Sequence, residues 1–241
     1  MDHSYIDKNV ARIRAEIDGA CRSEGLPSDG ITLMAAIKSA DVDEINYLHR
    51  VLGFNDVGEN RVQQLLEHYD AIKDDSLRIH FIGTLQTNKV KYIVDKVSMI
   101  QSLDSARLAE EINRRCGKIG KCMDVLIEIN SGHEDNKSGI SPEETSAFAQ
   151  SLEAYKNLRL RGFMTMAPRC EDDAEYRKYF GDTRILCSSI WKNVLHREDE
   201  MILSMGMSDS YIPAVCEGST LVRVGRGLFK KPDGENASPS N

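Results

Sequence analysis

The chain has 241 residues, of which 38 are acidic and 31 are basic, so its formal net charge is -7. At roughly 150 residues per average domain, this length fits one large domain or two small ones. Hydrophobic residues make up 41% of the chain, which is typical of a globular protein and excludes intrinsic disorder, collagen and coiled coil. Lysine and arginine are spread along the chain, so the sequence shows no electrostatic footprint for nucleic acid.

The sequence shows no sign of export or of membrane insertion. Its start, MDHSYIDKNV, contains acidic residues and lacks the apolar run of a signal peptide. The longest uncharged apolar run, near 33–37, is far shorter than the roughly 18 residues of a membrane-spanning helix. Six cysteines are scattered along the chain without a C-x-x-C pair: Cys21, Cys116, Cys122, Cys170, Cys187 and Cys216. This spacing suits neither a zinc site nor a small disulfide framework, so we expect a soluble cytoplasmic protein.

The predicted elements begin with a helix over residues 5–21, where Ile6, Val10, Ile13 and Ile17 recur on one helical face. Eight short runs with the composition of β-strands follow, at 31–38, 54–59, 78–83, 98–103, 123–130, 159–166, 201–206 and 220–225. Between these runs lie polar stretches with apolar residues at helical spacing, for example 106–115 and 142–155.

Eight strands alternating with helices predict an α/β fold, a single closed (β/α)8 TIM barrel with an extra N-terminal helix. An open doubly wound sheet would also explain the alternation, but it usually has a glycine-rich fingerprint after its first strand. The first strand here runs instead into Lys38-Ser39-Ala40-Asp41. Because no linker divides the chain, we expect one barrel domain over residues 1–230 and a solvated tail over 231–241.

Lys38 ends the apolar run LMAAIK. The active site of a TIM barrel is built at the carboxyl ends of its strands, so this position is a candidate for chemistry. One interpretation is a desolvated lysine whose pKa falls until the amine is a nucleophile. The other is a lysine whose ammonium extends from the rim into solvent. The position alone does not distinguish them.

Polar residues also end the second, third and fifth strands. One interpretation places Glu59 or Asn60 over a ligand at the mouth. In the other, Asn60 caps a helix beginning at Arg61. His80 alternates with apolar neighbours, a pattern more typical of a hydrogen-bonded core histidine than of a catalyst. The adjacent residues His133, Glu134 and Asp135 rarely converge on one ion, so we predict no metal site.

Two loops near the C-terminus resemble a phosphate site. SMGMSD (204–209) follows the seventh strand and RVGRG (223–227) follows the eighth, where TIM barrels commonly bind phosphate. Ordinary turn glycines with a helix cap at Ser208 or Asp209 are the alternative. A lysine on the first strand together with a phosphate site suggests a phosphorylated aldehyde held as a Schiff base, namely pyridoxal 5′-phosphate (PLP).

The segments AAIKSADVDEI, FNDVGENRVQ, HFIGTLQTNKVK, SLDS, INSGHEDNKSGI, LRLRGFMTMAP, LSMGMSD and LVRVGRGLF occur in this order. As a set they resemble the pyridoxal phosphate homeostasis protein family (YggS/PROSC), which is related to the barrel domain of alanine racemase. The resemblance covers about residues 5–230. It implies that PLP is linked to Lys38 and that the other binding residues are Asn60, His80, Met166, Ser204, Gly206, Arg223, Gly225 and Arg226.

In that resemblance Ser204, Gly206, Gly225 and Arg226 lie against the phosphate, Asn60, His80 and Met166 lie near the ring, and Arg223 faces the pyridine nitrogen. Two positions depart from the family pattern. Arg226 stands where relatives commonly have a small hydroxyl residue, so its guanidinium either contacts phosphate or points to solvent. Thr84 stands where a histidine is usual, which leaves the role of that position open.

The resemblance implies a PLP carrier, without catalytic residues, that buffers the cofactor and supplies apo-enzymes. Related racemases and decarboxylases have an added C-terminal β-domain, whereas only a short segment follows the eighth predicted strand here. For the same reason we expect a monomer. A PLP-dependent amino-acid racemase or decarboxylase is the alternative function, but Lys38 has no convincing partner as a second base. A third alternative is a barrel enzyme acting on an unrelated phosphorylated metabolite.

Overall fold

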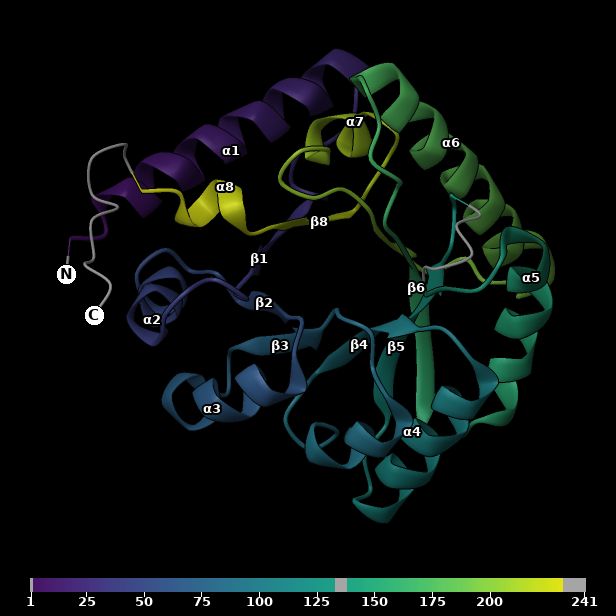
Figure 1. Cartoon of the computed structure of the whole chain (residues 1–241). Coiled ribbons are helices and arrows are strands. Elements are labelled where there is room, and N and C mark those ends of the chain that lie inside the picture. The colour runs from purple at the N-terminus through teal and green to yellow at the C-terminus, as the bar shows by residue number, and fades with distance from the viewer. Residues whose placement is uncertain (1, 133–137, 232–241) are drawn as a thin grey trace.

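The computed structural model describes residues 2–132 and 138–231. Its parallel strands close into a barrel in sequence order, and β8 pairs with β1 (Figure 1). The strands are β1 (Thr32–Ala36), β2 (Asp56–Glu59), β3 (Arg78–Phe81), β4 (Met99–Leu103), β5 (Met123–Ile129), β6 (Leu158–Thr165), β7 (Ile202–Ser204) and β8 (Leu221–Val224). The closed barrel confirms the predicted fold and excludes the open sheet.

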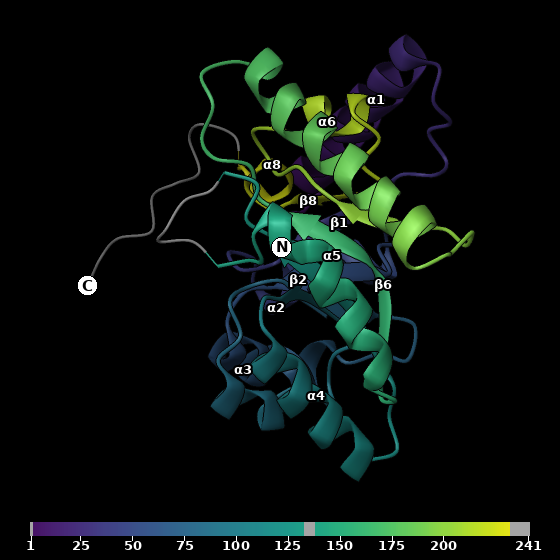
Figure 2. The same cartoon turned by 90° about the vertical axis from the view of Figure 1, so that its right-hand side faces the viewer.

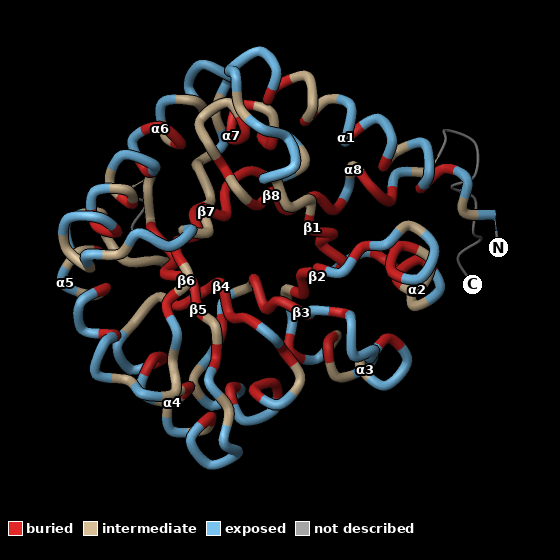
Figure 3. The backbone as a smooth tube through the Cα atoms, turned by 180° about the vertical axis from the view of Figure 1, so that it is seen from behind, coloured by how far each residue is buried: buried red, intermediate tan, exposed pale blue. Residues whose placement is uncertain are grey.

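Helices surround the barrel, and the strands are mostly buried while the outer sides of the helices are exposed (Figures 2 and 3). The helices are α1 (Ser4–Glu24), α2 (Val42–Arg50), α3 (Val62–Ile72), α4 (Ala106–Lys118), α5 (Pro142–Ser151), α6 (Asp173–Ser189), α7 (Tyr211–Cys216) and α8 (Arg226–Phe229). Two 3₁₀ segments, Thr87–Tyr92 and Leu152–Ala154, and one π segment, Ile190–Val194, complete the layer. The first 3₁₀ segment replaces an α-helix between β3 and β4.

The predicted N-terminal helix is confirmed as α1. Ile6, Val10, Ile13 and Ile17 are buried, and α1 packs against α7 and α8. Asn9 Nδ2 donates hydrogen bonds to the carbonyl oxygens of Leu228 and Lys230, each at 3.0 Å. The first helix therefore holds the segment that follows β8 in place.

The barrel wall separates two kinds of core. Successive strand residues face opposite sides, and the outward side chains form one large apolar cluster with the helices. Two small apolar clusters lie apart from it, around Met34 and Ile82 and around Leu126 and Met164. They fill part of the barrel interior, and buried polar side chains of β3, β4, β5, β7 and β8 occupy the remainder.

The observed strands end before the predicted ones at several places. β1 ends at Ala36 and β7 at Ser204, whereas the apolar runs extend to positions 38 and 206. Beyond those ends the chain leaves the ladder, so the residues that follow form the rim of the barrel. No helix within 2–132 and 138–231 is long and apolar enough to cross a membrane. Of the expected tail, only Lys231 is described.

Candidate functional site

Five of the expected binding residues lie at the same mouth of the barrel. Lys38, Asn60, Met166, Gly206 and Gly225 come one or two residues after the ends of β1, β2, β6, β7 and β8. Because all the strands are parallel, their carboxyl ends meet at one face, where TIM barrels build their sites. The closed topology thus brings together residues that are up to 187 positions apart in the chain.

Lys38 is an exposed rim residue rather than part of a buried strand. The Ile37 amide donates to the Gly58 carbonyl at 2.9 Å, and the Lys38 carbonyl accepts from Gln64 Nε2 at 2.8 Å. The interpretation of a lysine desolvated by its strand is therefore wrong, because the ladder ends at Ala36. The backbone of Lys38 is held on both sides while its side chain remains accessible to an aldehyde from solvent.

Asn60 is half-buried, and its Oδ1 atom is buried without a hydrogen-bond partner in the described part of the chain. Of the two interpretations of Asn60, the helix cap is wrong, because Arg61 is the N-cap residue of α3 and that position makes no side-chain capping hydrogen bond. Glu59 Oε1 accepts instead from the amides of Asn60 and Arg61, just before α3, at 2.6 and 3.0 Å.

Gly206 and Gly225 allow the loops after β7 and β8 to pack closely against neighbouring segments. Gly206 has a φ of 89°, and a Cβ atom there would lie 2.6 Å from the Cβ of Ala214. A Cβ at Gly225 would lie 2.9 Å from the carbonyl oxygen of Ala36. Only glycine fits both positions without strain, so both loops depend on glycine for their close packing.

Ser208 joins the two loops. Its Oγ accepts from the amides of Gly225 and Gly227, each at 3.3 Å. A hydroxyl group that accepts two hydrogen bonds keeps its own hydrogen for a third partner. Ser208 consequently has a hydroxyl hydrogen free for a further acceptor, whereas the hydroxyl hydrogen of Ser204 is donated to Gln101 Oε1.

Arg226 points into solvent. Its side chain is 72% exposed and pairs with Asp209, itself 70% exposed. Of the two interpretations of this departure from the family pattern, the structure favours the solvent-directed guanidinium. Thr84, the other departure, is also exposed.

Arg223 and Ser204 lie inside the barrel beneath the rim and are both buried. Arg223 NH1 donates to Ser204 O and Oγ at 2.8 and 2.6 Å, and NH2 donates to the Thr165 carbonyl at 2.9 Å. Ser204 Oγ in turn donates to Gln101 Oε1 at 2.8 Å. The expected contact of Ser204 with phosphate would require that this last bond break.

One buried acidic residue near Arg223 was missed at the level of sequence. Glu128 is 3% exposed on β5 and accepts a hydrogen bond from Ser138 at 2.8 Å. Burial raises the pKa of Glu128, with a further rise from Asp104. Burial also lowers the pKa of Arg223 to about 10, and the Glu128 carboxylate opposes that effect. A single charge inside the apolar run VLIEIN was the available signal for Glu128.

His80 is buried and hydrogen-bonded through both ring nitrogens, which confirms its interpretation as a core histidine. Met166 is half-buried against the small apolar cluster of Met99, Leu126 and Met164. The loop residues His133, Glu134 and Asp135 lie outside the described residues. Across 2–132 and 138–231 no group of three or more metal-binding side chains is found.

Comparisons with known proteins agree with the resemblance drawn from the motifs. Residues 5–232 match the family described as "Alanine racemase, N-terminal domain". A "Pyridoxal phosphate homeostasis protein" of Aquifex aeolicus is 39% identical over 225 residues, 92% of this chain and 96% of the relative. The solved structure of PipY from Synechococcus elongatus PCC7942, with PLP bound, is 28% identical with a TM-score of 0.79, covering 93% of this chain and 100% of PipY.

A more distant likeness concerns the fold alone. The alanine racemase of Clostridium difficile 630 has a TM-score of 0.74 at 15% identity, over 98% of this chain and 59% of the racemase. The nearer relatives match along nearly their whole length and are named for cofactor homeostasis rather than for a reaction. This chain belongs to the pyridoxal phosphate homeostasis protein family, whose members share the barrel of alanine racemase.

Proposed function

We propose that this protein binds PLP at the carboxyl-end mouth of its barrel, as a Schiff base on Lys38. The observation that supports this most is the meeting of an accessible lysine with two glycine-containing loops at one mouth of the barrel. Lys38 lies on the rim. Gly206 and Gly225 let the two neighbouring loops pack closely, because a Cβ atom at either position would clash with the protein. The unpartnered Oδ1 of Asn60 gives the mouth a polar atom that still needs a donor.

The residues present fit the chemical groups of PLP. The Ser208 hydroxyl, which keeps its hydrogen for a further acceptor, suits a phosphate beside the loops of Gly206 and Gly225, and Met166 offers an apolar contact to a ring. We assign Arg226 to the rim, where only its backbone borders the phosphate. Lys38 supplies the amine and Arg223 the group that faces the pyridine nitrogen.

PLP supplies an aldehyde that reacts with amines and a ring that accepts electrons. Arg223 is a cation beside that ring, and a cation disfavours protonation of the pyridine nitrogen. A ring nitrogen without its proton withdraws electrons weakly, so the site suits holding the cofactor better than carbanion chemistry. We therefore propose that the protein buffers PLP and supplies it to apo-enzymes.

We further propose that the barrel, residues 1–230, acts as a monomer in the cytoplasm. The six cysteines are all free thiols, as expected in a reducing compartment. The structural likeness to PipY, which has been solved with PLP bound, supports the ligand. The distant likeness to alanine racemase supports the fold and provides no reason to choose catalysis.

An absorption titration with PLP tests the binding. Wild type is expected to develop an imine band that saturates at one equivalent, and Lys38→Ala is expected to lose the band while retaining weaker phosphate-anchored binding. Lys156→Ala is a matched control, because Lys156 is exposed but precedes β6 at the opposite end of the barrel. A full imine band in Lys38→Ala would overturn the assignment.

The carrier role is tested with apo-enzymes and amino acids. Loaded protein is expected to restore activity to a PLP-dependent apo-enzyme and to leave a panel of L-amino acids unchanged. Turnover of an amino acid at rates typical of enzymes, about 1–1,000 per second, that disappears in Lys38→Ala would establish the racemase or decarboxylase alternative instead.

A further inference from the structure

A row of polar side chains crosses the barrel interior beneath the mouth. It runs from Arg223 on β8 through Ser204 on β7, Gln101 on β4 and His80 on β3 to Asp56 on β2. All five are buried, with at most 9% of any residue exposed. Each consecutive pair is joined by a hydrogen bond of 2.6 to 3.0 Å. The row starts at the residue assigned to the pyridine nitrogen and ends at the opposite end of the barrel.

The chemistry of the groups gives this row one direction. A guanidinium only donates and an ionised carboxylate only accepts, so Arg223 is the donor end and Asp56 the acceptor end. Burial alone would raise the pKa of Asp56, but hydrogen bonds from His80 and Arg78 lower it to about 2, so this carboxylate is ionised at neutral pH.

The intervening groups must follow that direction. His80 Nε2–H donates to Asp56 Oδ1 at 3.0 Å, and the Nδ1 atom of the neutral ring then accepts from Gln101 Nε2 at 2.9 Å. Gln101 Oε1 is left to accept the hydroxyl hydrogen of Ser204. The oxygen of that hydroxyl is thereby turned to accept from Arg223 NH1 at 2.6 Å.

Gln101 occupies its place because β4 is irregular there. Ile100 pairs with Val125 and Leu103 with Ile127, so three steps along β4 match two along β5. Such a bulge re-aims a side chain, and bulges are enriched near functional sites. Ser102, the next residue, is also buried, but its hydroxyl has no hydrogen-bond partner in the described ranges.

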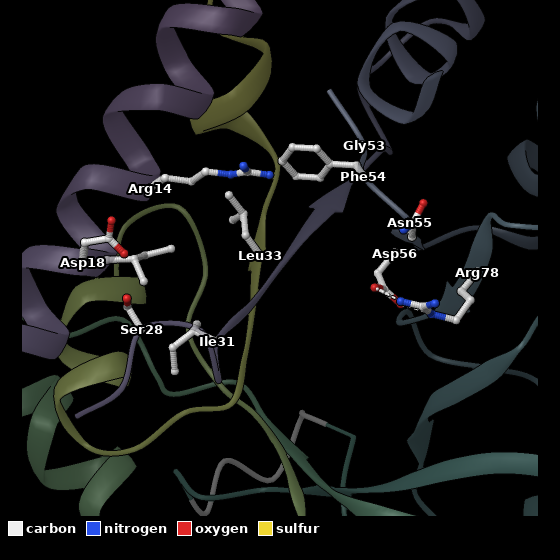
Figure 4. Close-up of a pocket in the computed structure, with 11 residues that line it drawn as sticks. Arg14, Asp18, Ser28, Ile31, Leu33, Gly53, Phe54, Asn55, Asp56 and Arg78 are labelled. Atoms are coloured by element: carbon white, nitrogen blue, oxygen red, sulfur yellow. Dashed lines mark hydrogen bonds and ion pairs between the residues drawn. The ribbon is translucent and has the colours of Figure 1, made fainter. Parts of the chain in front are cut away.

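The far end of the row is anchored by an ion pair at the amino-end face. Arg78 Nε and NH2 contact the two carboxylate oxygens of Asp56 at 2.7 and 2.5 Å, the arrangement drawn in Figure 4. The pair borders a cavity of about 300 Å³ that Arg14 and Phe54 also line. Arg78 is 56% exposed, so this end can be altered without opening the core.

We propose that Gln101 and His80 are positioning residues that hold Arg223 in its ring-facing place, with the Asp56–Arg78 pair setting the direction of the row. This role rests on the proposed function, since Arg223 matters to the ligand only if PLP binds at the mouth. Three of the five N–H groups of Arg223 are used by Ser204 and Thr165. The remaining two N–H groups have no acceptor in the described part of the chain. Because the guanidinium is planar and rigid, the three hydrogen bonds that hold it also set the direction of these two N–H groups.

The first experiment reads the row without any cofactor. In the ligand-free protein, ¹⁵N NMR of the imidazole is expected to show His80 as the neutral Nε2–H form with a proton protected from exchange. Gln101→Met keeps the length of the side chain and removes its hydrogen bonds to His80 and Ser204, so the His80 Nδ1 signal is expected to shift. An Nδ1–H form in the wild type would overturn the direction of the row.

The second experiment reads the effect at the mouth. Gln101→Met is expected to weaken PLP binding about fivefold, the scale of one lost buried hydrogen bond, and to shift the pH midpoint of the imine band. Ser102→Ala alters the neighbouring buried side chain outside the row and is expected to change neither quantity. Wild-type values in Gln101→Met would overturn the positioning role while leaving PLP binding intact.

Replacing an exposed residue tests whether the far end of the row affects the ligand at the mouth, and it leaves the core intact. Arg78→Met removes the far anchor and is expected to shift the pH midpoint of the imine band. Arg159→Met is the matched control, because Arg159 pairs with Asp124 across β6 and β5 and is 57% exposed, yet Asp124 is outside the row. Equal spectra for these two variants would overturn the role of the anchor. Absence of an imine in wild type would instead overturn the proposed function, whatever the NMR result.

Discussion

Replacing Asp56 by asparagine removes the carboxylate that both His80 and Arg78 contact. The Asp56 side chain is 11% exposed, so solvent screens its contacts little. Despite the opposing effect of burial, the two hydrogen-bond partners lower its pKa from 3.8 to about 2. A pKa lowered by this amount in the folded state stabilises the fold by about 2 kcal/mol at neutral pH.

The sign of this effect fixes its pH dependence. Because the folded-state pKa of Asp56 is below the unfolded value, its stabilisation is fully present above about pH 4 and is lost as the pH falls through about 2. Urea denaturation of wild type and Asp56→Asn is therefore expected to give a difference in unfolding free energy of about 2 kcal/mol at pH 7. The difference is expected to fall below about half a kcal/mol at pH 2.

Asp124→Asn provides the control, because Asp124 occupies the corresponding place opposite Arg159. Its contact is a hydrogen bond from the exposed Arg159 side chain, so its loss is expected to cost only about 0–1 kcal/mol. Equal stability of wild type and Asp56→Asn at pH 7 would refute this reasoning. A difference that stays constant from pH 4 to pH 2 would refute it equally.

Further predictions concern the mouth. Gly206→Ala forces a side chain into a φ of 89° against Ala214 and is expected to cost about 1–3 kcal/mol of stability, measured by urea denaturation. Gly19→Ala, which meets nothing within 4 Å in α1, is expected to stabilise by about 0.5–1 kcal/mol; a loss in both variants would contradict the steric argument. Arg226→Thr is expected to leave the Kd for PLP within about twofold of wild type because a solvent-screened charge contributes little, and a tenfold loss would place the guanidinium on the phosphate. PLP titration after treatment with a chelator is expected to match the untreated protein, and a lost imine band would reveal a metal.

The sequence predicted the parts of this molecule that depend on local pattern. All eight strands follow from short apolar runs, and α1 follows from the spacing of Ile6, Val10, Ile13 and Ile17. The glycines of the last two loops marked the mouth, because a backbone that needs positive φ or close approach selects glycine locally.

The interior row could not be predicted in this way. Gln101 and Ser204 are 103 positions apart and meet only because the barrel closes and β4 has a bulge. The interpretation of Lys38 as a desolvated lysine was wrong, because an apolar run does not show where the hydrogen bonds between strands end. Asn60 has the residue type of a helix cap, but α3 begins at Val62 with Arg61 as its N-cap, one residue later than a cap at Asn60 requires.

Peptide mapping after borohydride reduction tests the central claim most directly. Protein loaded with one equivalent of PLP is reduced, digested and examined by mass spectrometry, so that a Schiff base becomes a stable adduct on the lysine that formed it. The account predicts a single pyridoxyl adduct on Lys38 and none on Lys156. A stoichiometric adduct on another lysine, or the absence of any adduct in a protein saturated with PLP, would contradict it.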